Sequence, residues 1–419
     1  MLDLIIIGAG LTGLMAAYTA AKSGRQVKLI AKGLGATHWS AGTIDVLGYY
    51  PDERTLVEHP LQTIQELVKA QPQHPFALLD ETELKDTLQA FASLAKEIGL
   101  PYLGNADTNL ALPSPVGAIR PAWLAPQAQI TGDLSRDEPM LIVGLRGMRD
   151  FFPELIAENL RKQGHAARAA FLPLDLITDR RDSNTVQLAN GLDDPARRAK
   201  LAAELIKLVQ PGERVGLPAI LGMAEHTAVM RELQATLGAA VFEIPTLPPS
   251  VPGIRLTTAL RRRVEELGVR VEVNMDVKGF HAENGRIAWI ESDASARPLK
   301  HRADHFLLAT GGILGGGIMT DHTGHGWEVV FNLPLVLPEN RAVWFRTRFF
   351  DPAGHPIFSS GVQVNHQFQP VDSTGSPLYA NVFAAGGILA HADPIQERSL
   401  EGIAIATGSA AARRLAAHH

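Results

Sequence analysis

Three glycines near the start of the chain have a spacing that suits phosphate binding. Gly8, Gly10 and Gly13 follow an apolar run at residues 4–7 and precede a stretch of helical character at residues 14–23. In such a turn the first glycine permits a tight bend, the second lets the backbone approach a pyrophosphate, and the third lets the helix lie close to the strand. Amide donors at the start of the helix meet the anion. The spacing therefore predicts a dinucleotide-phosphate site.

Two later strands also run into glycines. A predicted strand at residues 305–309 ends in Thr310-Gly311-Gly312, and an apolar run at residues 382–385 ends in Gly386-Gly387. Glycine lets the backbone come close to a ligand, although a glycine pair also fits a tight turn. The order of these segments along the chain predicts that all three glycine turns surround one cofactor.

The second predicted strand, at residues 27–31, lacks the acid that binds a ribose hydroxyl in many strand-helix-strand units. Ala31 and Lys32 occupy that position. Lys32 fits a 2′-phosphate or a flavin phosphate, and it fits a solvated lysine at a strand end equally well. The cofactor contact of Lys32 is therefore one of two open interpretations.

The stretch at residues 33–45 is small, polar and glycine-rich, as a loop around a flat ring system would be. Ser40, Gly42 and Thr43 are its candidate ring contacts. His38 is the one residue of this loop that could carry a histidine-linked flavin, but an ordinary hydrogen-bonding histidine is the interpretation that we favour. We predict no covalent link.

The elements that must position these turns continue in the second half of the chain. Residues 254–267 have helical character, residues 269–291 fit a hairpin, and residues 399–415 fit a final helix. Another strand and helix fall at residues 140–164, where the glycine spacing lacks the full fingerprint and favours packing over a second nucleotide site.

Carbon oxidation beside a redox cofactor needs a base for a hydroxyl proton and a cation for an anionic substrate. His322 and His325 lie in a glycine-rich loop after the predicted strand at residues 305–309, and they are the candidate bases. Arg255 can fork onto a phosphate. The alternatives are surface histidines and a solvated arginine, so these three residues are candidates only.

Composition excludes several classes of function. The chain has 419 residues, 46% of them hydrophobic, and a formal net charge of -5, which argues against nucleic-acid binding. It has no cysteine, so an ordinary iron-sulfur cluster must be held by another chain. We predict no metal site, because the histidines lack metal-binding spacing.

Residues 4–21 carry no charge, but their glycines favour a strand-turn-helix over a membrane span. We therefore expect a soluble, cytoplasmic chain that contacts a membrane only through a partner.

Several longer motifs resemble one family of flavoproteins. The chain resembles the fumarate reductase type in general and the B subunit of anaerobic glycerol-3-phosphate dehydrogenase more closely. The resemblance is carried by Gly8-Ala-Gly-Leu-Thr-Gly13, His38-Trp-Ser-Ala-Gly-Thr-Ile-Asp45, His74-Pro-Phe-Ala-Leu-Leu79, Pro113-Ser-Pro-Val-Gly-Ala-Ile-Arg120 and Pro245-Thr-Leu-Pro-Pro-Ser-Val-Pro-Gly-Ile-Arg-Leu256.

This resemblance implies oxidation of sn-glycerol 3-phosphate to glycerone phosphate, with electrons passed to quinone. It implies an A subunit that carries FAD and is favoured as the place of the hydride-accepting site, and a C subunit that carries iron-sulfur clusters and holds the complex at the inner face of the membrane. It also implies FMN as the cofactor of this chain. The glycine spacing argues for FAD, and the missing acid argues against an adenosine half, so FMN stands first and FAD is a close alternative.

The fold class expected is α/β, a Rossmann-like FAD/NAD(P)-binding fold with an inserted capping domain. We expect residues 1–45, 250–312 and 375–419 to form the cofactor domain. Residues 46–249 and 313–374 are expected to form a capping domain for substrate or partner. Two other functions stay open: a stand-alone FAD-dependent reductase of the fumarate reductase type and a non-catalytic scaffold.

Overall fold

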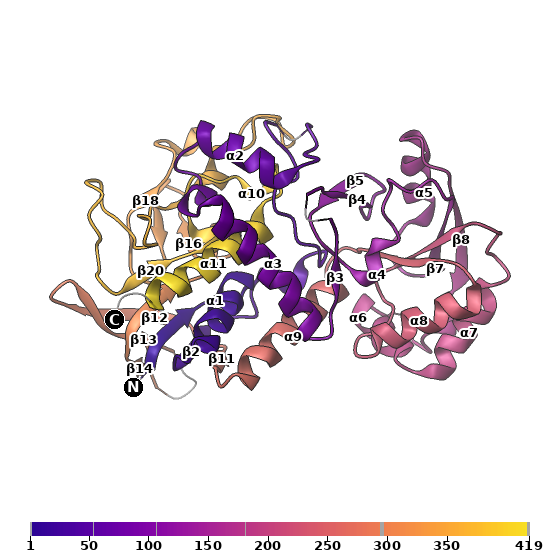
Figure 1. Ribbon diagram of the computed structural model, residues 1–419, viewed down its shortest axis with the longest axis horizontal. Coiled ribbons are helices and arrows are strands. Elements are labelled where there is room, and N and C mark those ends of the chain that lie inside the picture. The colour runs from indigo at the N-terminus through magenta and orange to yellow at the C-terminus, as the bar shows by residue number, and fades with distance from the viewer. Residues whose placement is uncertain (1, 53, 106, 181, 294–296, 417–419) are drawn as a thin grey trace. The chain divides into compact units, whose positions relative to one another are not determined.

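The computed structural model describes residues 2–416 except 53, 106, 181 and 294–296. The chain divides into two compact units, each traced in Figure 1. The first unit comprises Met1–Ala36, Asp45–Ile98 and Ala259–His419, and the second comprises Thr37–Ile44 and Gly99–Thr258.

A parallel sheet forms the centre of the first unit. Each neighbouring pair of its strands is parallel, as expected for a Rossmann-like fold. In the described residues the strand order is β11 (Arg270–Val273), β2 (Val27–Ala31), β1 (Leu2–Ile7), β15 (Ala303–Leu308) and β20 (Val382–Ala384). The inner strands β2, β1 and β15 are rich in apolar residues and mostly buried, as parallel strands between helices require.

Three helices of the first unit pack beside one another next to this sheet (Figure 1). They are α1 (Leu11–Lys22), α3 (Glu81–Glu97) and α11 (Leu400–Ala416). Small residues let α1 and α11 approach closely, since a Cβ on Gly408 would lie 2.6 Å from the carbonyl oxygen of Thr12. Glu83 of α3 accepts hydrogen bonds from Arg414 of α11 at 2.6 and 2.7 Å. These contacts fix the first turn of α1 in place.

The other elements of the first unit are short. They include two helices, α2 (Pro60–Ala70) and α10 (Pro394–Glu397), and the small sheets formed by β12 (Val277–Glu283), β13 (Arg286–Ser292) and β14 (Leu299–His301), by β16 (Ile318–Thr320) and β17 (Gly326–Glu328), and by β18 (Leu335–Val336) and β19 (Gly361–Val362).

The predicted hairpin at residues 269–291 is wrong in its first part. Its beginning forms β11, which joins the main sheet beside β2. Asn274 then has a left-handed φ of 61°, and the chain leaves the sheet there. The hairpin itself consists of β12 and β13, lies within the predicted range except for its last residue, and turns at Asn284 and Gly285, both with a positive φ.

The second unit has a parallel sheet of its own. In the described residues its order is β10 (Val241–Ile244), β9 (Arg214–Pro218), β7 (Met140–Arg146) and β8 (Ala167–Pro173). Its helices are α4 (Gln127–Ile130), α5 (Pro153–Lys162), α6 (Thr185–Leu192), α7 (Pro195–Leu205) and α8 (His226–Leu237), and its short strands are β3 (Tyr102–Leu103), β4 (Leu110–Pro113), β5 (Ile119–Ala122) and β6 (Ala125–Pro126). The helix α9 (Val251–Glu266) has its first half in this unit.

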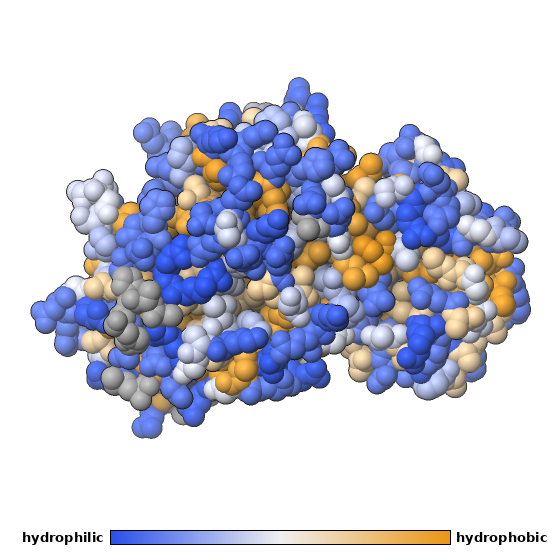
Figure 2. All heavy atoms as spheres, viewed as in Figure 1, coloured by the Kyte–Doolittle hydropathy of each residue, from blue (hydrophilic) through white to orange (hydrophobic). Residues whose placement is uncertain are grey.

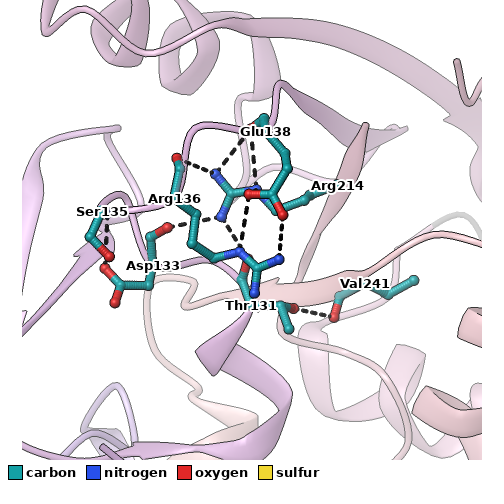
Figure 3. A network of polar contacts seen from close by, with 7 residues as sticks. All are labelled: Thr131, Asp133, Ser135, Arg136, Glu138, Arg214 and Val241. Carbon is teal, nitrogen blue, oxygen red and sulfur yellow. Dashed lines mark hydrogen bonds and ion pairs between the residues drawn. The ribbon is translucent and has the colours of Figure 1, made fainter. Parts of the chain in front are cut away.

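A buried arginine ties a loop to this second sheet (Figure 3). The side chain of Arg214 is 2% exposed and donates to the carbonyl oxygens of Thr131 at 2.7 Å and Asp133 at 2.9 Å. It also donates to the carbonyl oxygen of Glu138 at 3.2 Å, and Arg136 in turn pairs with the Glu138 carboxylate. Burial lowers the pKa of Arg214, but a guanidinium titrates so high that it stays charged. The network is structural.

The two compact units divide the chain differently from the predicted domains. Residues 46–98 and 313–374 group with the first unit, and residues 37–44 and 250–258 group with the second. The amide of Gly402 donates to the carbonyl oxygen of Asp45 at 3.0 Å, which ties the segment after residue 44 to α11. The role of the second unit as a cap for substrate or partner stays a prediction.

Hydrophilic residues predominate on the surface shown in Figure 2, with apolar side chains in small groups. Among the described residues, no helix combines the length and apolar character that crossing a bilayer needs.

Candidate functional site

The glycine segments predicted from the sequence end three neighbouring strands of the main sheet. In the parallel register Ile7 pairs with Leu308, and Leu308 pairs with Ala384. The segments that follow these residues therefore leave the sheet at the same edge, which is where α/β sheets bind ligands. The structure thus brings together the candidate residues Gly8, Gly10, Gly13, Gly311, Gly312, Gly386 and Gly387.

Two of these glycines make the turn and the helix possible. Gly8 has a φ of 122°, and a Cβ there would lie 2.2 Å from the carbonyl oxygen of Ala309. A Cβ on Gly13 would lie 1.9 Å from the carbonyl oxygen of Gly8. A side chain at either position would collide with the backbone. Because glycine has none, the chain can turn tightly between the end of β1 and the start of α1.

Gly10 differs from its two neighbours because the space beside it is open. It is the residue before the first turn of α1, and it has an ordinary negative φ of -74°. A Cβ on Gly10 would meet no heavy atom of the described residues within 4 Å. The first turn of α1 holds no acid and has no side-chain cap, and the positive end of the helix dipole lies there, which favours an anion. This open approach fits a flavin phosphate.

The segment after β20 packs against the start of α1. Gly386 has a φ of 77°, and a Cβ there would lie 2.0 Å from the Oγ1 of Thr12. Its amide donates to the Oγ1 of Thr407 at 2.8 Å. A Cβ on Gly312 would lie 2.5 Å from the carbonyl oxygen of Gly387. These contacts lock the glycine turns together, so the edge of the sheet is preorganised.

One buried polar atom at this edge has no partner. The Oγ1 of Thr310, between β15 and Gly311, is buried and makes no hydrogen bond within the described residues. A buried hydroxyl without a partner is costly, and a bound ligand would relieve that cost. Together with the open side of Gly10, this atom indicates that the residues present fit a phosphate-bearing cofactor.

Lys32 lies at the carboxyl end of β2, as predicted, with an ion pair that the sequence did not reveal. Its side chain is 80% exposed, and its Nζ lies 3.2 Å from the Oδ2 of Asp276. Asp276 follows β11, the neighbouring strand, and also pairs with Lys278 at 2.6 Å. Burial would raise the pKa of Asp276, but hydrogen bonds from Lys278 and Lys32 hold it below its ordinary value. A carboxylate therefore reaches the end of β2 from the next strand.

The candidate ring contacts Ser40, Gly42 and Thr43 belong to the second unit. Thr43 is buried, and the Oγ of Ser40 accepts a hydrogen bond from the amide of Gly42 at 3.2 Å. Gly42 has a φ of 80°, and a Cβ there would lie 2.5 Å from the Cβ of Pro252. The hydroxyl of Tyr102 donates to the carbonyl oxygen of Gly42 at 2.5 Å. The loop is thus held by its own unit, and its contact with a flavin stays a proposal.

His322 and His325 lie in the turn between β16 and β17, and both are exposed. The carboxylate of Asp321 closes this turn by accepting from the amides of Thr323 at 2.8 Å and His325 at 3.1 Å. The ring of His325 stacks on Trp327 at 5.6 Å. Both histidines are accessible to solvent, and their catalytic role stays a proposal.

Arg255 is buried in the second unit and has partners for most of its donors. Its Nη1 and Nη2 donate to the carboxylate of Glu243 at 2.7 and 3.0 Å, and its Nε donates to the carbonyl oxygen of Gly222 at 2.9 Å. The expected grip on a substrate phosphate would compete with Glu243. This geometry is that of a structural ion pair. The structure thus divides the three catalytic candidates between its two units.

No group of three or more histidine, aspartate or glutamate side chains in the described part of the chain is arranged to hold a metal ion.

Comparison with known proteins identifies the family. The model of the FAD binding domain matches residues 3–403. The B subunit of anaerobic glycerol-3-phosphate dehydrogenase from Yersinia pseudotuberculosis is 31% identical over 412 residues, which cover 96% of this chain and 95% of that protein. The chain belongs to the family of these B subunits. Its predicted resemblance to that family is thereby confirmed.

Other members of the family match over a similar length. The B subunit of Pectobacterium atrosepticum is 31% identical over 96% of this chain and 96% of its own length. The probable B subunit of Halobacterium salinarum is 30% identical over 98% of this chain and 96% of its own length. Among solved structures, the open conformation of a flavocytochrome c3 fumarate reductase is similar with a TM-score of 0.47 and 11% identity, covering 100% of this chain and 78% of that one.

The match to the FAD binding domain and the parallel sheet confirm the predicted Rossmann-like fold and the prediction of flavin binding. Membership of this family makes the chain a flavin oxidoreductase. Sequence reasoning missed three side chains at the edge of the sheet, Thr12, Thr310 and Asp276. Thr12 and Thr310 had a signal, because each directly precedes a glycine of a predicted turn, whereas Asp276 had none.

Proposed function

We propose that the chain is a flavin-binding subunit of an anaerobic glycerol-3-phosphate dehydrogenase. The reaction is oxidation of sn-glycerol 3-phosphate to glycerone phosphate, with the electrons passed to quinone. The proposal is supported by similarity over 96% of the chain to proteins of that name. It is also supported by Gly10, which leaves the start of α1 open to a phosphate.

FAD is the flavin that the geometry favours. The complete glycine turn suits a pyrophosphate, and the carboxylate of Asp276 reaches the end of β2, where an adenosine ribose would lie. FMN, which stood first from the family resemblance, becomes the second candidate, and the positive charges of Lys32 and Lys278 around that carboxylate keep it open. When bound, the flavin supplies the acceptor for the two electrons that leave the substrate.

Oxidation of the secondary alcohol removes the hydroxyl proton and the hydrogen on the same carbon together with two electrons. A side chain of the protein must take the hydroxyl proton. His322 and His325 are the candidate bases, because both rings are accessible and the turn that carries them is closed by Asp321. Arg255 forms an ion pair with Glu243 inside the second unit. We therefore do not propose that Arg255 binds the substrate phosphate while this ion pair is formed.

The onward path of the electrons requires other chains. The sequence has no cysteine, so it cannot supply the ligands of an ordinary iron-sulfur cluster. We propose an FAD-carrying A subunit and an iron-sulfur C subunit as partners, and glycerol 3-phosphate as the substrate of the complex. The C subunit would hold this chain at the cytoplasmic face of the membrane.

The test is co-expression with the two partner subunits and measurement of quinone reduction that depends on glycerol 3-phosphate. Gly10→Ala is expected to lower this rate at least about tenfold through loss of flavin, whereas Gly279→Ala, a glycine in β12 with equally open surroundings, is expected to leave it unchanged. His322→Gln and His325→Gln test which histidine is the base. Replacement of the base is expected to lower kcat at saturating substrate.

Two results would contradict this account. Full activity of the isolated chain with an artificial acceptor would support a stand-alone reductase. An unchanged rate in a Gly10→Ala complex whose copy of this chain holds no flavin would support a scaffold.

A further inference from the structure

The second unit contains a cavity of about 290 Å³ that none of the roles above uses. It lies where α8 begins, and residues of α9 and of the segments around β3 and β6 complete its wall. Its volume is near the lower end of the roughly 300–1,000 Å³ of small-molecule sites. The cavity therefore suits a small ligand.

The charge of the cavity wall is positive. Arg231 and Arg255 line it, and no aspartate or glutamate does so among the described residues. The carboxylate of Glu243 neutralises Arg255 at 2.7 Å. Arg231 makes no ion pair or hydrogen bond within the described residues, so its guanidinium is available to a ligand. Arg231 therefore contributes one uncompensated positive charge to the cavity wall.

The remaining polar groups of the wall add donors without adding charge. The side-chain amide of Gln127 has no partner in the described structure. Burial, together with the charge of Arg255, lowers the pKa of His226 to about 4, while Glu243 and Asp193 oppose this shift. His226 is therefore a neutral imidazole at neutral pH and offers one N–H.

The rest of the wall is apolar. The side chains there have no strong hydrogen-bonding group, and they belong to Leu100, Pro101, Pro126, Met230 and Pro252. Glycerol 3-phosphate has no apolar body to cover such a surface. We propose that this cavity binds a small organic anion, whose carboxylate or phosphate contacts Arg231 and Gln127 and whose apolar body lies against Met230 and the prolines.

The cavity shares its wall with the loop proposed to contact the flavin. Tyr102 lines the cavity and donates to the carbonyl oxygen of Gly42 at 2.5 Å. Pro252 lines it as well and is the residue that excludes a side chain at Gly42. A ligand in the cavity would therefore lie against two residues that hold the loop at residues 37–44 in place.

Binding is tested by isothermal titration calorimetry of the full chain with phenyl phosphate, benzoate, inorganic phosphate and neutral benzyl alcohol. We expect phenyl phosphate or benzoate to bind at one site, and the stronger of the two identifies the head group. Benzyl alcohol and inorganic phosphate are expected to bind at least about tenfold more weakly, because each lacks half of the interactions.

Three variants locate the site. Arg231→Gln is expected to weaken binding about tenfold, since a hydrogen bond to a charged group is lost. Thr227→Trp places a large ring at an exposed position on the wall and is expected to abolish binding without altering the core. Arg262→Gln removes the same charge from an exposed position of α9 and is expected to leave affinity unchanged.

Absence of binding by both aromatic anions would overturn the proposal. Equal affinity of the Arg231→Gln and Arg262→Gln variants would also overturn it, since the site would then lie elsewhere. None of these measurements depends on bound flavin or on turnover, so they separate this proposal from the function proposed above.

Discussion

Thr12 and Gly386 fix the start of α1 against the segment that follows β20. Gly386 has a left-handed φ of 77°, and a Cβ at this residue would lie 2.0 Å from the Oγ1 of Thr12. These residues are far apart in the chain, yet the parallel register of β1, β15 and β20 brings their segments to one edge of the sheet. The proposed flavin site depends on this close packing.

Gly386→Ala is predicted to destabilise the protein. The new methyl group meets Thr12, and alanine adopts the left-handed φ at a cost, so the free energy of unfolding should fall by about 2 kcal/mol or more. Urea unfolding followed by circular dichroism measures the change. Gly279→Ala is the control, because a Cβ there meets no described heavy atom within 4 Å. Equal stability of both variants would show that the close approach is not present in solution.

Gly10→Ala is predicted to weaken flavin binding while leaving the fold intact. The new methyl group has room in the protein but occupies the space through which a phosphate approaches the first turn of α1. The dissociation constant for flavin, measured by quenching of flavin fluorescence, should rise at least about tenfold. Unfolding by urea should match the unmodified protein. Unchanged flavin affinity would place the phosphate elsewhere.

Asp276→Asn is predicted to weaken binding of FAD more than binding of FMN. The substitution removes a carboxylate that can accept a ribose hydroxyl and leaves Lys32 without its 3.2 Å partner. Only FAD carries the adenosine ribose, so the ratio of the two dissociation constants should change several-fold. Lys278→Gln serves as the control, since it keeps both Asp276 and Lys32. An equal loss for both flavins would contradict the assignment of this carboxylate to the adenosine half.

Glu83→Gln is predicted to reduce the pH dependence of stability. Burial would raise the pKa of Glu83, but hydrogen bonds and charge from Arg414 and Arg413 hold it below the ordinary 4.5. A lowered folded-state pKa gives stability that is present above pH 4.5 and is lost as the pH falls through the folded-state value. Glu83→Gln should therefore destabilise the protein at pH 7 and flatten its loss of stability below pH 4.5. A parallel acid profile for both proteins would contradict the ion pair between α3 and α11.

Local sequence patterns were sufficient to predict the nucleotide-binding half of the fold. The spacing of Gly8, Gly10 and Gly13 after an apolar run specifies a strand, a turn and a helix, because each step is a local property of the backbone. The order of the predicted strands along the chain was the basis for placing Gly311 and Gly386 in the same site as the first glycine turn. All these residues meet at one edge, although their cofactor contacts remain proposals.

The pairing of distant side chains could not be predicted from the sequence. The ion pair of Lys32 with Asp276 depends on β11 lying beside β2, and nothing local to either residue encodes that neighbour. Arg255 has the sequence context of a phosphate ligand, but its partner Glu243 lies on another element of the second unit. The grouping of residues 46–98 with the first unit similarly depends on packing of α3 against α11.

The most direct test of the central claim is to purify the chain, record its visible spectrum and identify what acid treatment releases. The account predicts a yellow protein that releases FAD. Release of FMN would keep the flavin site but contradict the adenosine contact at Asp276. A colourless protein that binds neither flavin on titration would contradict the flavin site at Gly10 altogether.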